Sequence, residues 1–273
     1  MTRIIHNKWF HYAIRILRLQ RILKRVLSFL SPTFKHDGIV YRIKSPESFL
    51  IAREIFKQGT YDLLLNQTKI HTVIDLGCNT GFFTCLLSGR YGGKNIKGVL
   101  VDADADVLKE CEWHLQANHI DNCKTICAII GATNSQTSDF FISEFNISSS
   151  TRPFDENYPF PLRTIKKVKR PVVTLKKLIT TIFASERVNI LKIDIEGSEM
   201  ELLAQDLSCL NQVDWIVLEW HKWVISLEEV INGLSKYNFT LIDILKEDSI
   251  CGLVLLQNDN SPNRALKPVV ADM

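Results

Sequence analysis

The sequence predicts an α/β fold: a mostly parallel sheet with helices on both faces, closed by an antiparallel hairpin at the C-terminal end. Three observations predict it. Apolar runs of strand length recur along the chain, helical patterns lie between them, and only a short turn around residues 246–249 separates the last two runs. Continuous apolar strands that alternate with helices are typical of a parallel sheet with right-handed crossovers. A short turn joins antiparallel strands.

The expected elements follow one another in a regular order. We expect strands at 72–77, 97–103, 124–130, 188–195, 214–221, 240–245 and 250–257, and helices near 82–90, 105–118, 175–184, 198–206 and 226–237. Residues 143–170 interrupt this order with a stretch rich in Ser, Asn, Pro and basic residues. Long loops of this kind are lids, binding loops or disordered insertions. We therefore expect one domain over 35–273 that contains a loop at 143–170.

The composition is that of a globular protein, and its charge is unevenly distributed. The 273 residues include 33 Lys and Arg, 30 Asp and Glu, and 46% hydrophobic residues, which excludes a disordered tail, a collagen-like rod and a disulfide miniprotein. Residues 1–30 contain seven bases and no acid, so the other 243 residues have 26 bases against 30 acids. The net charge of +3 therefore combines a basic N-terminal segment with a mildly acidic domain.

The basic segment, residues 1–34, predicts an amphipathic helix. An apolar stripe follows helical spacing between residues 14 and 30, and basic residues lie on the other side. The stripe consists of Ile16, Leu19, Leu23, Val26, Leu27 and Leu30. The bases are Arg18, Arg21, Lys24 and Arg25. Ser31-Pro32 should end the helix. Such a helix binds an anionic membrane surface, or it packs on its own domain or on a second subunit. Both interpretations remain open at this point.

The location of the protein is expected to be cytoplasmic, with peripheral contact at the inner face of a membrane as the alternative. No stretch approaches the ~20 apolar residues that a spanning helix needs. Arginines interrupt the N-terminal hydrophobic residues, so a signal peptide is not expected. The seven cysteines are an odd number and many lie in apolar runs, which indicates reduced thiols in an intracellular protein.

A glycine turn follows the first expected strand, in the string Asp75-Leu76-Gly77-Cys78-Asn79-Thr80-Gly81. Glycines permit a tight turn and close approach of a ligand, and the helix that follows offers amide donors. The spacing departs from the dinucleotide fingerprint and from the phosphate-binding loop. Asp75 is placed to accept a hydrogen bond from an ammonium group, and Asp102, after the second strand, is placed to bind ribose hydroxyls. The alternative for this pair is a tight turn with a helix cap.

Four titratable residues end two later strands. Asp194 and Glu196 follow one strand, and Glu219 and His221 end the next. Open α/β sheets bind ligands at the carboxyl ends of their strands, so these groups are candidates for acid–base chemistry or for binding a divalent metal. Helix caps and ion pairs are the structural alternatives.

These motifs together resemble the FkbM family of class I S-adenosylmethionine-dependent methyltransferases, over residues 56–257. The specific part is the string Leu191-Lys192-Ile193-Asp194-Ile195-Glu196-Gly197-Ser198-Glu199, followed by Glu219 and His221. The resemblance implies a Rossmann-like fold and S-adenosylmethionine as cofactor. It implies that Asp75, Gly77, Asn79 and Gly81 hold the methionine part of the cofactor, that Asp102 holds the ribose, and that Ala128, Ile129, Ile130 and Gly131 flank the adenine. The chain departs from the family pattern at Ala103, where a proline is usual, and at Lys176, where an acid is usual.

The activity that the resemblance implies is methyl transfer to a hydroxyl of a sugar, a glycolipid or a natural product. Asp194 or Glu196 is then the expected base or metal ligand, and His221 the next candidate base. A membrane-associated protein that binds the cofactor without catalysis is one alternative, and a nucleotide-cofactor oxidoreductase is a weaker one. We expect a small-molecule or glycan acceptor rather than a nucleic acid, because the basic runs have no interleaved aromatic residues.

Overall fold

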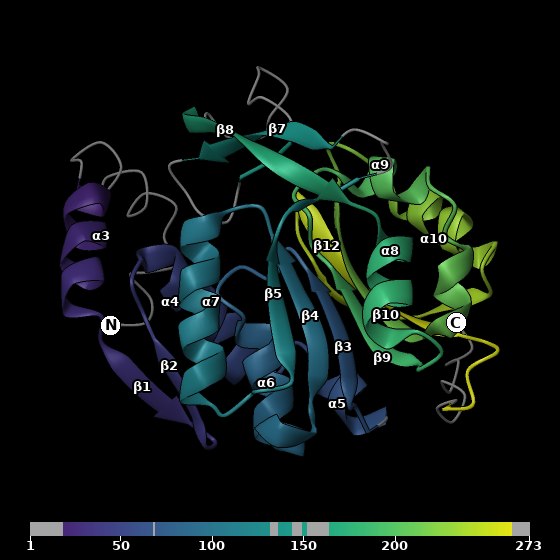
Figure 1. Cartoon of the computed structure of the whole chain (residues 1–273), viewed down its shortest axis with the longest axis horizontal. Coiled ribbons are helices and arrows are strands. Elements are labelled where there is room, and N and C mark those ends of the chain that lie inside the picture. Colours follow the sequence, from purple (N-terminus) through teal and green to yellow (C-terminus); the bar gives the residue numbers. More distant parts are fainter. Residues whose placement is uncertain (1–18, 68, 132–135, 144–148, 152–163, 264–273) are drawn as a thin grey trace.

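The computed structural model describes residues 19–67, 69–131, 136–143, 149–151 and 164–263, and a seven-stranded sheet lies at its centre (Figure 1). The strand order is β11-β12-β10-β9-β3-β4-β5. The strands are β3 Thr72–Leu76, β4 Lys97–Asp102, β5 Cys123–Cys127, β9 Val188–Ile193, β10 Val213–His221, β11 Phe239–Glu247 and β12 Cys251–Asn258. Neighbours from β10 to β5 pair in parallel, whereas β12 pairs antiparallel with both β10 and β11. The predicted fold class, including the closing hairpin, is confirmed.

Helices cover both faces of the sheet because successive strand residues point to opposite sides. Val73 and Ile190 belong to one core, and their neighbours Ile74 and Leu191 belong to the other. Helices α4 Pro46–Lys57, α5 Asp62–Gln67, α6 Phe82–Tyr91 and α7 Ala105–Ala117 pack into the first core; α8 Leu175–Leu178, α9 Glu199–Leu203 and α10 Leu227–Ser235 pack into the second. Local sequence fixes several helix starts. Ser226 and Glu229, for example, form a capping box at α10.

The structure corrects the expected strand at 124–130 and the expected loop at 143–170. The chain leaves the central sheet at Ala128 and continues as β6, Ile129–Ile130, in a second sheet of order β6-β8-β7. Strands β7 Thr137–Ser143 and β8 Thr164–Val173 pair antiparallel and lie across the carboxyl ends of the central strands (Figure 1). The expectation of an irregular loop is therefore wrong at residue 143 and at 164–170. Residues 144–148 and 152–163 of that segment lie outside the described residues.

Other differences concern short elements. The expected helix at 175–184 is one α-turn followed by the π-helical segment η3, Ile179–Phe183, and the expected helix at 198–206 is the shorter α9. Helices α4 and α5 were not predicted from the sequence, and neither was the hairpin of β1 Thr33–His36 and β2 Ile39–Arg42. The two-residue turn of this hairpin is Asp37-Gly38, with φ of 47° and 82°. An Asp-Gly pair is a strong hairpin indicator, but strands of four residues gave no readable alternation.

The predicted N-terminal helix is present as α3, Leu19–Leu30, while residues 14–18 lie outside the described residues. Among the described helices none is long and apolar enough to cross a membrane. All seven cysteines are free thiols, as the sequence indicated.

Candidate active site

A cavity of about 320 Å³ opens at the carboxyl ends of the central strands, where the sequence analysis expected the site. Its wall includes the glycine turn after β3, the end of β4, the start of the second sheet, and the turns after β9 and β10. The predicted residues that line it are Gly77, Asn79, Asp102, Ala128, Ile129, Ile130, Asp194, Glu196 and Glu219. Asp75, Gly81 and His221 lie behind this wall. Its volume is in the range of ligand pockets in proteins.

The glycine turn depends on a close approach between two strands. Gly77 has φ of 72°, and a Cβ at this position would overlap the carbonyl oxygen of Asp194 and lie 2.7 Å from its carbonyl carbon. Gly77 and Cys78 donate their amides to the carbonyl of Val101, at 2.8 and 3.0 Å. The turn therefore lies directly between the end of β4 and the end of β9, and no residue larger than glycine fits at position 77.

Asp102 connects the second strand to the glycine turn. Its Oδ2 accepts the amide of Asn79 at 2.9 Å, and its Oδ1 accepts the amide of Asp104 at 2.8 Å. Burial raises the pKa of Asp102 to about 6, although these two hydrogen bonds lower it. Beside it, Ala128 and Ile129 line the cavity together with Phe140 of β7. This part of the cavity offers a carboxylate next to an apolar surface, which suits a ribose and an adenine ring.

Asp75 is fully buried and pairs with Lys192 rather than facing the cavity. Lys192 Nζ lies 3.6 Å from Asp75 Oδ1 and 3.1 Å from Asp194 Oδ2. Burial lowers the pKa of Lys192, but Asp194 and Asp75 together raise it well above its ordinary value, so the ammonium stays charged. The expected contact between Asp75 and a cofactor ammonium thus has no counterpart in this arrangement. Lys192, which the sequence analysis left without a role, was detectable as a lone base in an apolar strand, two residues before an acid.

His221 is held between two carboxylates. Its Nδ1 lies 2.9 Å from Glu199 Oε1, and its Nε2 lies 3.4 Å from Glu196 Oε2. Burial lowers the pKa of His221, but the bonds to Glu196 and Glu199 raise it to about 12. The imidazolium has no free lone pair at neutral pH, which argues against His221 as a base. Glu199, a further residue that the sequence analysis missed, is completely buried and also accepts the amide of Gly197 at 3.1 Å.

Glu196 stands at the centre of the turn after β9. It has φ of 48°, which is rare for a residue with a side chain, and its carbonyl accepts a hydrogen bond from Ser150 Oγ at 2.9 Å. Burial raises the pKa of Glu196 to about 7, although His221 lowers it. Residues held in such a conformation cluster at functional sites. Glu196 is therefore a carboxylate whose pKa suits proton transfer near neutral pH.

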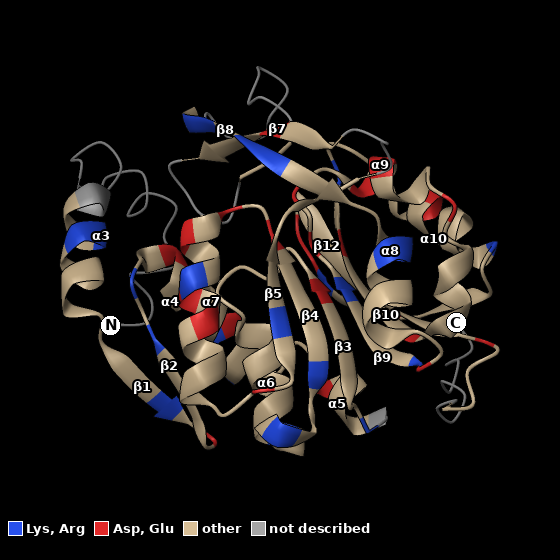
Figure 2. Cartoon of the chain, in the orientation of Figure 1, with Lys and Arg blue, Asp and Glu red and all other residues tan. Residues whose placement is uncertain are grey.

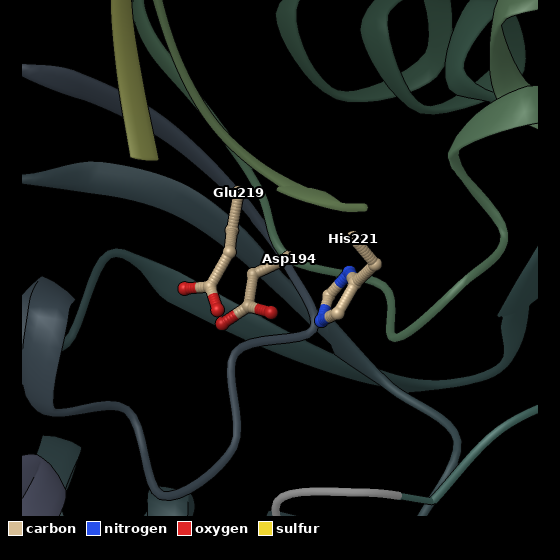
Figure 3. Close-up of side chains that lie close together, drawn as sticks. All are labelled: Asp194, Glu219 and His221. Carbon is tan, nitrogen blue, oxygen red and sulfur yellow. The ribbon is translucent and has the colours of Figure 1, made fainter. Parts of the chain in front are cut away.

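Asp194, Glu219 and His221 converge from β9 and β10 (Figure 3). One ligand atom of each lies within 4.8 Å of the others, and these atoms are of the types that divalent cations accept. A cation here would have to displace the Lys192 ammonium from Asp194 and take the Nε2 proton of His221. The charges already present therefore favour proton chemistry over metal binding. Burial, followed by the charge of Asp194, raises the pKa of Glu219 to about 7.

One region of the cavity was not predicted from the sequence. It is lined by Tyr61, Cys251 and the ion pair of Glu54 with Lys246, whose Oε2 and Nζ lie 2.8 Å apart. Glu54 belongs to α4 and Lys246 to β11, 192 residues away in the sequence. No local pattern reports a pair at that separation. This region of the cavity combines the aromatic ring of Tyr61 with charged groups, and it adjoins Glu219.

The comparison with protein families decides the assignment. The family model described as the methyltransferase FkbM domain matches residues 56–241, which is more than half of the chain. The chain belongs to the FkbM methyltransferase family. It is accordingly an S-adenosylmethionine-dependent methyltransferase. The resemblance read from the glycine turn and from the Asp194–Glu199 string is confirmed.

Several solved structures are similar to this FkbM protein at low identity. A SAM-dependent methyltransferase from Aquifex aeolicus is 12% identical, with a TM-score of 0.42 over 77% of this chain and 97% of that one. Methyltransferase FkbM from Methylobacillus flagellatus is 15% identical, with a TM-score of 0.41 over 68% of this chain and 44% of that one. TrmK from M. capricolum, solved with S-adenosylhomocysteine, is 10% identical, with a TM-score of 0.43 over 75% of this chain and 70% of that one. No curated protein sequence matches the chain.

Proposed function

We propose that this methyltransferase transfers the methyl group to a hydroxyl oxygen of a polar acceptor, such as a sugar, a glycolipid headgroup or a natural product. The observation that carries the proposal is the pair Glu196 and Glu219, two carboxylates with a pKa of about 7 that line the same cavity as the glycine turn. A hydroxyl is a poor nucleophile until its proton is removed, and a carboxylate titrating near pH 7 is suited to remove it.

The cavity wall fits S-adenosylmethionine. Asp102 and the apolar patch of Ala128 and Ile129 would hold the nucleoside part. Thr80 lines the cavity beside the glycine turn, and its buried Oγ1 has no hydrogen-bond partner within the described part of the chain, so it is available to the amino-acid part. The carboxylates that line the cavity would attract the positively charged sulfonium of the cofactor. When bound, the cofactor supplies a methyl group that is already activated by the positive sulfur.

The chain's own residues then position and deprotonate the acceptor. Glu196 accepts the hydroxyl proton, and His221 keeps the carboxylate of Glu196 oriented through the contact at Nε2. Glu199 acts as a positioning residue, because it fixes the imidazolium at Nδ1. Glu219 lies on the acceptor side of the cavity and accepts a hydrogen bond from a second hydroxyl. General-base catalysis of this kind contributes about 10²–10⁴-fold to a rate.

The test separates cofactor binding from turnover. Calorimetry should detect binding of S-adenosylmethionine by the full chain, and a panel of glycosides and glycolipid headgroups with methyl-labelled cofactor identifies the acceptor. Glu196→Gln should leave cofactor affinity within about threefold and lower kcat by ~10²-fold or more. Glu228→Gln, an exposed change on α10, is the matched control. Undiminished turnover in E196Q would refute the role of Glu196.

Transfer to an amine is the alternative that the same assay distinguishes, because an acid-rich cavity also attracts ammonium groups. Labelled product from amine acceptors alone would replace the hydroxyl proposal. Cofactor binding without product from any acceptor class would favour the non-catalytic alternative.

A further inference from the structure

Exposed apolar side chains gather on one region of the described chain. Eight of them lie between residues 22 and 50: Ile22, Leu23, Val26, Phe29 and Leu30 on α3, Phe34 on β1, and Phe49 and Leu50 on α4. Three others are scattered over the rest of the described chain. Phe29 is 88% exposed and Leu30 is 64% exposed. Large apolar side chains concentrated in this way mark an interaction surface. We call these eight residues the N-terminal apolar surface.

Helix α3 contacts the domain through α4. Leu27 packs against the core cluster that includes residues of α4, and α3 contacts α4. The end of the helix is closed by the amide of Ser31, which donates to the carbonyl of Leu27 at 2.7 Å. Three other members of the predicted stripe, Leu23, Val26 and Leu30, are exposed. Figure 1 shows α3 at the edge of the molecule beside α4. Packing on its own domain therefore accounts for a single member of that stripe among residues 22–30.

Basic residues border this apolar surface. Helix α3 contains no acidic residue, and a basic band crosses it in Figure 2. Helical spacing places Lys24 and Arg25 on the side away from Leu30. On α4, Lys57 falls on the same outward side as Phe49, two turns along the helix. An apolar face bordered by bases and without acids is the composition of helices that lie in the headgroup region of anionic membranes.

We propose that the N-terminal apolar surface binds the surface of an anionic bilayer. The apolar side chains of α3 enter the boundary between headgroups and acyl chains, and Lys24 and Arg25 remain among the phosphates. A second copy of the chain fits less well as the occupant. A second copy would bury the apolar side chains of α3 but would offer no opposite charge to its bases, because α3 contains no acidic residue. A bilayer offers an apolar phase and negative charge together.

Helix α4 connects the N-terminal apolar surface to the cavity. Helix α4 carries Phe49 and Leu50 on its outer side and lines the cavity with Ile51, Glu54 and Ile55. Binding through the N-terminal apolar surface therefore brings one wall of the cavity to the membrane. The proposal of membrane binding does not depend on methyl transfer, because vesicle binding is measured without cofactor or acceptor.

Flotation of the full chain with lipid vesicles tests the proposal. Vesicles of phosphatidylcholine with roughly 30 mol% phosphatidylglycerol should bind the protein at least ~10-fold more tightly than phosphatidylcholine alone, and high salt should weaken the binding. The double change Phe29→Ser and Leu30→Ser should lower the affinity for anionic vesicles by ~10-fold or more, because both side chains are exposed and available for insertion. Cofactor binding by calorimetry checks that this variant is folded.

Ile165→Ser is the matched control, since Ile165 is 62% exposed on β8 and lies outside the N-terminal apolar surface. It should bind vesicles as the unmodified chain does. Failure to float with anionic vesicles, or equal binding by the F29S and L30S double variant, would overturn the proposal. Sedimentation velocity tests whether a second copy of the chain binds this surface instead. If the chain forms a concentration-dependent dimer, the double variant abolishes that dimer, and vesicles are not bound, the surface belongs to a dimer interface.

Discussion

Replacing Gly77 with Ala tests whether the glycine turn is shaped by its contact with the end of β9. A Cβ at this position would overlap the Asp194 carbonyl and lie 2.7 Å from its carbon atom. Carbon atoms in contact are about 3.5–4.0 Å apart, so the contact with the carbon alone would require the turn and β9 to separate by nearly 1 Å. The overlap with the carbonyl oxygen requires a larger movement. That movement opposes the bonds from Gly77 and Cys78 to Val101 and from the Asp194 amide to Leu76.

Gly38 provides the matched control. It has φ of 82°, close to the 72° of Gly77, but a Cβ there has no atom within 4 Å. Gly38→Ala therefore carries only the conformational cost, about 1–2 kcal/mol. Gly77→Ala adds the overlap with a neighbouring strand, and we expect a total of roughly 3–5 kcal/mol.

Chemical denaturation and calorimetry measure both effects. The midpoint temperature should fall by roughly 2–6 °C in G38A and by roughly 8 °C or more in G77A. Affinity for S-adenosylmethionine should be unchanged in G38A and at least ~10-fold weaker in G77A, because the turn lines the cavity. Equal stability and equal cofactor affinity in the two variants would show that the close approach of Gly77 to Asp194 is not what shapes the site.

Three further predictions concern the buried charges. Glu199→Gln removes one of the two carboxylates that hold the His221 proton, so NMR titration should show the imidazole pKa below its value in the unmodified protein; an unchanged titration would contradict the positioning role. Lys192→Met leaves the two carboxylates it bridges unpaired and should cost about 3–5 kcal/mol of unfolding free energy, with a larger loss at pH 8 than at pH 5; a loss independent of pH would contradict the pairing. Thermal unfolding should also depend on pH in the unmodified chain. Glu196 and Glu219 have a folded pKa of about 7 against an ordinary value of 4.5, so the folded state binds more protons between these values and stability should decrease as the pH rises from 5 to 8, by roughly 5 °C. Glu219→Gln should reduce this decrease, and a midpoint temperature that rises over the same range would refute the assignment.

Under the proposed function, the arrangement around His221 gives different roles to Glu196 and Glu199, two acids three residues apart. Glu199 is fully buried and bonded to both the His221 ring and a backbone amide, so it orients that ring. Glu196 lines the cavity and meets the same ring at the longer distance of 3.4 Å, so it can exchange a proton with a ligand. Environment rather than residue type separates the two functions.

The sequence alone determined the order of the seven central strands, the glycine turn and the place of the acids at strand ends. These features are local: apolar periodicity predicts a strand or helix within about ten residues, and a strand that ends in Asp194 or Glu219 must present it at the sheet edge. The amphipathic character of α3 was likewise readable from spacing alone. The Asp194–Glu199 string is also local in the sequence, and it therefore indicated the family.

Only the tertiary structure decided which partner each group meets. Asp75 and Lys192 are far apart in the chain, and their pairing moved Asp75 from the expected ligand contact to a position behind the cavity wall. His221 meets Glu199, a glutamate 22 residues away in the sequence, and this pairing argues against the expected role of His221 as a base. Strand β8 was mistaken for a loop because its polar sequence is ordered by pairing with β7, and the exposure of Phe29 depended on what the domain leaves uncovered. Composition and periodicity report a residue's own preference, whereas burial, charge pairing and exposure are set by residues distant in sequence.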